Sequence, residues 1–243
     1  MIKKHIPNAL TLLNLFSGLI ALIFVFNDNI QLSFAFVCLG IFFDFWDGFA
    51  ARMLKVSSPL GLQLDSLADM VTSGVVPGMV MYKLLEGIQH NYEEFHVTDE
   101  FFFMKAVPFL GFIITLGSAM RLAKFNIDTR QTDSFIGLPT PGNALFILSL
   151  PLILNNPTFE WEFELLSNPY VLVVITLLSA YIMNAELPLF SLKTKNKNLS
   201  DNKLSIFFLG ISAFLLVLLQ FEAIPLIIIF YIVLSIILQY MKK

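Results

Sequence analysis

The chain has 243 residues, of which 57% are hydrophobic and only 14% are charged, with a formal net charge of -3. Soluble domains average about 25% charged residues, so this composition excludes an ordinary soluble protein and indicates an integral membrane protein. Membrane lipids are therefore expected partners, and nucleic acid is not.

Eight apolar segments recur along the chain, and most approach the length of about 20 residues that a membrane-spanning helix needs. We predict helices over residues 6–26, 30–53, 63–85, 105–126, 141–156, 169–186, 204–220 and 222–241. The fifth is short and a tight turn separates the last two, so six or seven true spans remain open. Because no linker interrupts the series, residues 1–243 are predicted to form one all-helical, polytopic membrane domain.

The positions of the lysines and arginines predict the orientation of these spans. If the N-terminus is cytoplasmic, all but Lys83 and Lys105 of the 15 basic residues fall in inner segments or at inner helix ends. An excess of basic residues marks the cytoplasmic side of a membrane protein. We therefore expect both termini, and the short loop between the second and third spans, on the cytoplasmic side of the cell membrane.

Four aspartates, Asp44, Asp47, Asp65 and Asp69, lie in or at the ends of the second and third predicted spans. The first two are i,i+3 and the last two i,i+4, so each pair shares one helix face. Carboxylates at this depth are costly and mark functional sites. Four like charges need cations to hold them together, and hard oxygen ligands favour Mg²⁺, Mn²⁺ or Ca²⁺.

The sequence alone also allows two other interpretations of these aspartates. They could brace helices through buried ion pairs, although Arg52 is the one basic residue near them in sequence. They could also line the ion path of a cation-coupled transporter, since carboxylates within the membrane mark such paths as well.

Residues 44–69 follow the pattern D-x2-D-G-x2-A-R-x8-G-x3-D-x3-D. This pattern resembles, at all eight fixed positions, the signature of the CDP-alcohol phosphatidyltransferases. That resemblance implies a metal-dependent enzyme that transfers a phosphatidyl group from a CDP-linked lipid to a small alcohol and releases CMP. It also implies a six-helix core, here residues 5–186, and a homodimer. The two helices over 204–241 lie outside that core.

Three other segments narrow the resemblance to the phosphatidylserine synthases of bacteria and archaea. They are IPNALTLLNLFSG (6–18), RLAKFNI (121–127) and FIGLPTPGNA (135–144). The implied substrates are CDP-diacylglycerol and L-serine. Lys124 departs from the pattern, because many relatives have an arginine there. Glycerol 3-phosphate and inositol phosphate remain alternative acceptors, which would make the product phosphatidylglycerophosphate or phosphatidylinositol phosphate. These acceptors carry a phosphate and favour a denser cationic pocket.

The resemblance assigns roles to individual residues. Two divalent ions, Mg²⁺ or Mn²⁺ with Ca²⁺ also able to bind, are expected on Asp44, Asp47, Asp65 and Asp69. Asp69 is the expected general base. The residues expected to contact the CDP-lipid are Asn8, Thr11, Gly48, Ala51, Arg52, Ser58 and Gly61. Arg121, Lys124 and Asn126 are expected to hold the acceptor or a substrate phosphate. Asn8 and Thr11 could instead cap the first helix. GLPTPGN is most simply a turn into the next helix, with lining of the site as the alternative.

Overall fold

The computed structural model describes residues 5–56, 58–93, 106–128, 135–190 and 203–241. The helices are α1 (His5–Phe26), α2 (Ile30–Leu54), α3 (Pro59–Asp69), η2 (Met70–Val75), α4 (Val76–Glu93), η3 (Val107–Phe112), α6 (Ile113–Ile127), α7 (Thr140–Asn155), α8 (Glu160–Leu166), α9 (Pro169–Asn184), α10 (Lys203–Leu219), η5 (Gln220–Glu222) and α11 (Ala223–Tyr240). Two short strands, β1 (Phe135–Ile136) and β2 (Pro188–Leu189), form an antiparallel pair. The predicted polytopic helical membrane protein is confirmed.

Each predicted span overlaps a helix, but the segments differ in how well they suit a membrane. Among the described residues, four stretches are long and apolar enough to cross one: His5–Phe26, Ile30–Leu54, Val107–Ile127 and Lys203–Gln239. The pair α8 and α9, bent by 74°, would make a fifth if it forms one span. The last stretch contains α10 and α11, which were predicted as separate spans.

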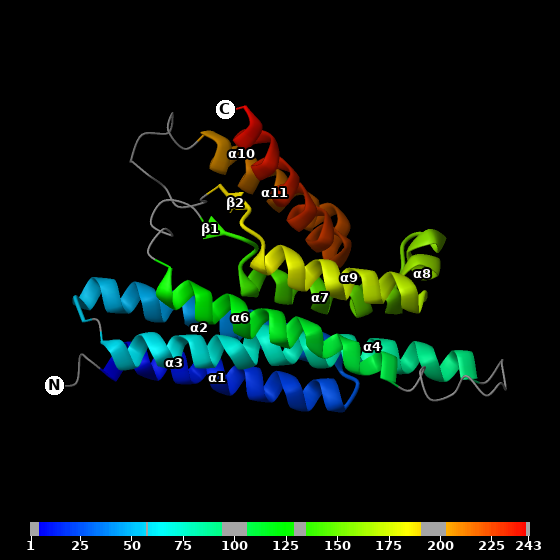
Figure 1. Ribbon diagram of the computed structural model, residues 1–243, viewed down its shortest axis with the longest axis horizontal. Helices are drawn as coiled ribbons and strands as arrows, with labels where there is room; N and C mark the ends of the chain where they lie inside the picture. Colours follow the sequence, from blue (N-terminus) through cyan, green and yellow to red (C-terminus); the bar gives the residue numbers. More distant parts are fainter. Residues whose placement is uncertain (1–4, 57, 94–105, 129–134, 191–202, 242–243) are drawn as a thin grey trace.

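The helices converge at one end of the bundle (Figure 1). The start of α1, the end of α2, the start of α3 and the end of α6 all lie there, on the left of the view. α1 packs along α2 and also contacts α3, while α6 packs against α9. The arrangement brings the ends of four helices, from separate parts of the sequence, to one place.

The third predicted span is one helical run from Pro59 to Glu93 with a π-helix in its middle. This π-helix, η2, starts directly after Asp69. The wider turn of a π-helix frees backbone groups and is frequent at functional sites. Thr115 of α6 donates a hydrogen bond of 3.0 Å to the carbonyl of Gly74 within it. The hydropathy pattern did not predict this interruption.

The C-terminal helix α11 packs against α7 and β2, and α10 packs against α11, with both helices oblique to the rest of the bundle (Figure 1). Rings of Phe190, Phe208 and Tyr231 contact one another there, with centroids 5.0 to 5.7 Å apart. The Tyr231 hydroxyl donates a hydrogen bond of 2.8 Å to the carbonyl of Phe190. The two helices are thus attached to the segment that follows α9. The division into a core over 5–186 and added helices over 204–241 stays a prediction.

Candidate active site

A tight turn between α2 and α3 sets the relative position of the two aspartate pairs. Lys55, which ends α2, takes a left-handed conformation with φ of 53°. The Val56 amide donates to the carbonyl of Ala51 at 3.0 Å. Ser58 then caps α3, because its hydroxyl accepts a hydrogen bond of 3.0 Å from the Gly61 amide. The second helix therefore ends and the third begins within a few residues, and the two helices face each other.

The aspartates meet across this junction. Carboxylate oxygens of Asp44, Asp47 and Asp65 all lie within 4.8 Å of one another. Asp44 and Asp47 come from α2, and Asp65 comes from α3. Asp69 is close enough to Asp65 and Asp47 to repel them electrostatically. Four acidic side chains from two helices thus form one cluster, and their mutual repulsion favours the binding of cations or protons.

The cluster has the chemistry of a divalent-cation site. All its donors are hard carboxylate oxygens, the type that Mg²⁺ and Mn²⁺ prefer. The Oδ1 atom of Asp65 is buried and has no hydrogen-bond partner among the described residues. In the described part of the chain, none of the four aspartates forms an ion pair with a lysine or arginine. The cluster therefore does not brace the helices through ion pairs.

The first helix orients two of the aspartates through hydrogen bonds. The Thr11 hydroxyl lies 2.5 Å from Oδ2 of Asp47 and 3.1 Å from the carbonyl of Pro7. One turn further along, the Asn14 side-chain amide donates to Oδ1 of Asp69 at 3.0 Å. Both residues of α1 are buried. Thr11 was predicted to contact the CDP-lipid, and the structure shows that it also contacts an aspartate directly.

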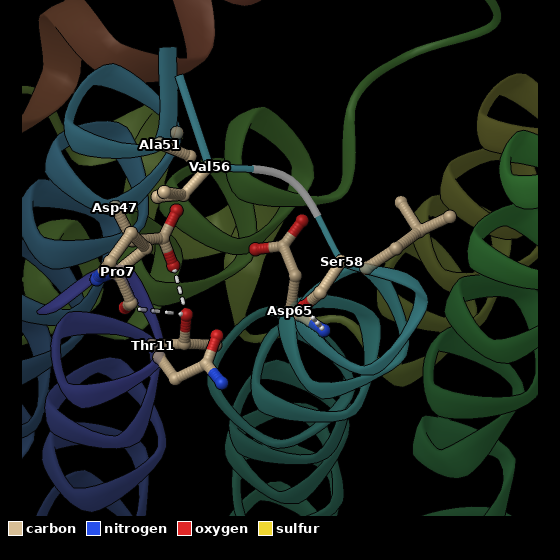
Figure 2. Close-up of a pocket in the computed structure, with 11 residues that line it drawn as sticks. Pro7, Thr11, Asp47, Ala51, Val56, Ser58 and Asp65 are labelled. Carbon is tan, nitrogen blue, oxygen red and sulfur yellow. Dashed lines mark hydrogen bonds between the residues drawn. The ribbon is translucent and has the colours of Figure 1, made fainter. Parts of the chain in front are cut away.

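A cavity of about 260 Å³ opens between α1, α2 and the start of α3 (Figure 2). Asp47 and Asp65 face it from opposite sides. Six of the seven residues predicted to contact the CDP-lipid line this cavity, the exception being Arg52. The lining residues are Pro7, Asn8, Thr11, Asp47, Gly48, Ala51, Val56, Ser58, Gly61, Leu62 and Asp65.

Two glycines keep this cavity open. A Cβ atom at Gly61 would lie 3.1 Å from the Ser58 hydroxyl and 3.2 Å from Oδ1 of Asn8. A Cβ atom at Gly48 would lie 3.3 Å from Nη1 of Arg52. The exposed Arg52 side chain therefore lies over Gly48, at the edge of the cavity that Gly48 lines.

A second cavity, of about 250 Å³, is lined by three of the aspartates together with residues of α6 and of the start of α7. Asp65 lines both cavities, so the cluster forms the wall between them. Arg121 is buried beside the second cavity and donates a hydrogen bond of 3.3 Å to the carbonyl of Gly137. The lining residues are Asp44, Asp65, Ser66, Asp69, Arg121, Leu122, Phe125, Pro139, Thr140 and Pro141.

The other two residues expected at the acceptor are placed differently. Lys124 is exposed and lines a neighbouring cavity of about 370 Å³, which it shares with Arg121, Asp128 and Glu186. Asn126 and Ser66 bond to each other, with the Asn126 amide donating at 2.9 Å. Of the three, Arg121 is therefore the residue that the structure brings beside the aspartates.

One residue that contacts the aspartates was not predicted from the sequence. Asn14 was not singled out, although it contacts Asp69 directly. Pro139, Thr140 and Pro141 line the second cavity, which is the less favoured of the two interpretations given for GLPTPGN. Its density of proline and glycine next to a polar threonine was the available signal.

The chain resembles known proteins over most of its length. The profile of the family described as CDP-alcohol phosphatidyltransferase matches residues 4–182. Three curated relatives all carry the name CDP-diacylglycerol–serine O-phosphatidyltransferase. The Bacillus subtilis protein is 36% identical over 152 residues, covering 60% of this chain and 76% of that protein. The Saccharomyces cerevisiae protein is 32% identical, covering 62% and 54%. The Methanocaldococcus jannaschii protein is 31% identical, covering 62% of each. The chain thus spans less than two thirds of the length of two of these relatives.

Proposed function

This chain belongs to the CDP-alcohol phosphatidyltransferase family, and from that premise we propose that it makes phosphatidylserine from CDP-diacylglycerol and L-serine. The relatives named for this reaction support the choice of acceptor. The single observation that carries the proposal is the aspartate cluster, whose members face two cavities at one end of the bundle. Each cavity offers one substrate a place beside the aspartates.

Asp44, Asp47, Asp65 and Asp69 are the residues that would hold divalent ions, two per site, as Mg²⁺ or Mn²⁺ with Ca²⁺ also able to bind. The buried, unpartnered Oδ1 of Asp65 and the oxygen-only donor set support this assignment. When bound, such ions neutralise the diphosphate and the charge that develops on its oxygens. The protein residues then have to place the two substrates and move one proton.

Asp69 is the proposed general base. The serine hydroxyl is a weak nucleophile and needs a base within hydrogen-bonding reach of its proton. Asp69 takes that proton as the serine oxygen bonds to the phosphorus that carries the diacylglycerol. The bond from this phosphorus to the oxygen of CMP breaks, and CMP leaves with that oxygen. Asp69 suits this role because it lines the second cavity together with Asp44 and Asp65.

The first cavity is proposed to take the nucleotide end of CDP-diacylglycerol. Asn8, Thr11 and Ser58 supply polar atoms, and Gly48, Ala51 and Gly61 leave space against the helices. Arg52 lies over Gly48 and can contact phosphate oxygens from the rim. Ser58 already caps α3, so its hydroxyl donates to the nucleotide while it accepts from Gly61.

The second cavity is proposed to take L-serine. Arg121 is the one cationic residue among its described lining residues, and one guanidinium suits one carboxylate. An acceptor with its own phosphate favours more positive charge than this wall offers. Lys124 lines the adjoining cavity and acts on charged substrates as they approach, and Asn126 holds α6 against α3 through Ser66. Lys124 and Asn126 are thus proposed to act near the acceptor, whereas Arg121 is proposed to contact it.

We further propose that the site and both termini face the cytoplasm. The placement of the basic residues supports this orientation. Lys83, one of the two exceptions, forms an ion pair at 3.1 Å with Asp28, which lies beyond the far end of α1.

A homodimer through the third and fourth predicted spans is also proposed. Phe109, Leu116 and Met120 present a large exposed apolar surface on the fourth. Cross-linking at Leu116→Cys in native membranes tests this contact.

The decisive experiment measures CMP release from CDP-diacylglycerol by the purified full chain. We expect release only when serine and Mg²⁺ or Mn²⁺ are both present, and its loss on chelation with recovery after metal is restored. Glycerol 3-phosphate and inositol phosphate are tested side by side with serine. Release with one of these instead of serine would change the acceptor and keep the enzyme class. Absence of CMP with every acceptor would overturn the proposal and favour a transport role.

A further inference from the structure

Asn14 of α1 forms hydrogen bonds both to Asp69, the last residue of α3, and to the π-helix that follows it. Its side-chain amide donates to Oδ1 of Asp69 at 3.0 Å. Its backbone carbonyl accepts a hydrogen bond of 3.1 Å from the hydroxyl of Thr72, which lies within the π-helix. Asn14 and Thr72 are both fully buried. One residue of α1 therefore fixes both the carboxylate and the first π turn beyond it.

Two glycines allow the helices to approach closely around these contacts. A Cβ atom at Gly18 would lie 2.4 Å from the Thr72 hydroxyl oxygen. A Cβ atom at Gly40 would lie 2.9 Å from Oδ1 of Asn14 and 2.7 Å from Cγ2 of Thr72. Separations this short leave no room for a larger residue, so α1, α2 and η2 are closely packed at this level. Asn14 consequently has little freedom to move away from Asp69.

The side-chain oxygen of Asn14 indicates that the amide donor is the part of this side chain that matters. Oδ1 of Asn14 is buried and has no hydrogen-bond partner in the described part of the chain. A buried amide oxygen without a partner is costly. An apolar residue of similar size would avoid that cost, so the benefit of Asn14 must come from its donor. That donor is directed at the carboxylate of Asp69.

We propose that Asn14 is a positioning residue that holds Asp69 in the orientation needed for proton transfer. This inference rests on the proposed role of Asp69 as the base. The Asn14 amide donates to one lone pair of Oδ1, whose other lone pair stays available to an ion, and Oδ2 is the atom for the serine proton. The close packing around Asn14 and the bond to Thr72 keep the amide in place. Without it, Asp69 rotates, and the reaction slows although both substrates still bind.

The test compares Asn14→Leu with wild type in the CMP release assay, using the full chain in phospholipid micelles. Leucine has the same branched side-chain skeleton of four heavy atoms, without polar groups, and suits a membrane interior. We expect kcat to fall about 10- to 100-fold, the scale of loss that follows from misplacing a reacting group. The KM values for serine and CDP-diacylglycerol should change less than threefold. Asn14→Ala provides a second substitution if the leucine variant does not fold.

Ser17→Ala is the matched control. Ser17 is also buried on α1, and its hydroxyl donates to the carbonyl of Leu13 at 2.8 Å, within its own helix. We expect this variant to keep kcat within twofold. Unchanged kcat in a folded Asn14 variant would overturn the proposal, and so would a rise in KM alone. Failure of both Asn14 variants to fold, with Ser17→Ala folded, would also count against it by showing a structural role. Absence of CMP release by wild type would instead reject the proposed function.

Discussion

The hydroxyl of Thr11 lies 2.5 Å from Oδ2 of Asp47, so the first helix directly contacts a carboxylate of the aspartate cluster. A hydrogen bond to a charged group contributes about 1.5–3 kcal/mol. Thr11→Val keeps the side-chain shape but removes this bond. We expect the concentration of Mg²⁺ for half-maximal CMP release to rise about tenfold, because Asp47 loses its orientation. A metal titration of the variant measures this shift.

Thr176→Val is the control for that substitution. The Thr176 hydroxyl is buried and bonds at 2.8 Å to the carbonyl of Leu172 within α9. The same change there should leave the metal requirement within twofold. Equal shifts in both variants would mean that Thr11 acts through general packing and not through Asp47.

Replacing Asp69 separates catalysis from substrate binding. Asp69→Asn keeps the size of the side chain but removes the base, so we expect turnover to fall by at least about 100-fold, within the range typical of general base catalysis. CDP-diacylglycerol binding should remain largely intact, because the first cavity is lined by other residues. Equilibrium binding of the lipid and single-turnover CMP release measure the two effects. Loss of binding with unchanged chemistry per bound substrate would contradict the assignment.

Closing the first cavity should affect one substrate only. Gly61→Val places side-chain atoms where a Cβ would already be 3.1 Å from the Ser58 hydroxyl. We expect the KM for CDP-diacylglycerol to rise at least about tenfold, a cost of about 1.4 kcal/mol, as expected for mild overpacking. The KM for serine should be unchanged. Steady-state kinetics with each substrate varied in turn test this.

Gly87→Val is the matched control for the glycine substitution. Gly87 is exposed on α4, and an added Cβ there would meet nothing within 4 Å. Both variants introduce the same β-branched residue into a helix, so they share its helix cost. If Gly87→Val raised the KM for CDP-diacylglycerol as much as Gly61→Val, the first cavity would not be the lipid site.

Arg121 and Lys124 should differ in their effect on the acceptor. Arg121→Met removes the buried cation beside the second cavity, and we expect the KM for serine to rise at least about tenfold, a loss of about 1.5–3 kcal/mol. Lys124→Met removes an exposed cation beside the adjoining cavity and should change that KM less than threefold. Steady-state kinetics at varied serine measure both. Similar effects of the two variants would place serine between the cavities.

Local patterns in the sequence were sufficient to predict the helices and the pairing of the aspartates. Hydropathy predicted the helices because the backbone in a membrane must satisfy its own hydrogen bonds. The aspartate positions were predictable because residues three or four apart share a helix face. The rule was not sufficient for Arg121 and Lys124, which line one cavity together although Arg121 is buried and Lys124 is exposed. Positions three apart still differ by about 60° around the axis, so one faces the bundle and the other its surface.

Hydropathy and residue spacing thus determined the helical membrane class and the two acidic helix faces, since both depend on neighbours along one chain segment. The tertiary structure decided the rest. The contact between Asn14 and Asp69 joins residues 55 positions apart, and it depends on the π-helix and on close packing at Gly18 and Gly40. The placement of the aspartates between two cavities likewise follows from how separate helices pack. Packing between distant segments leaves no periodic signal in the sequence, because it depends on shape and not on the order of residues.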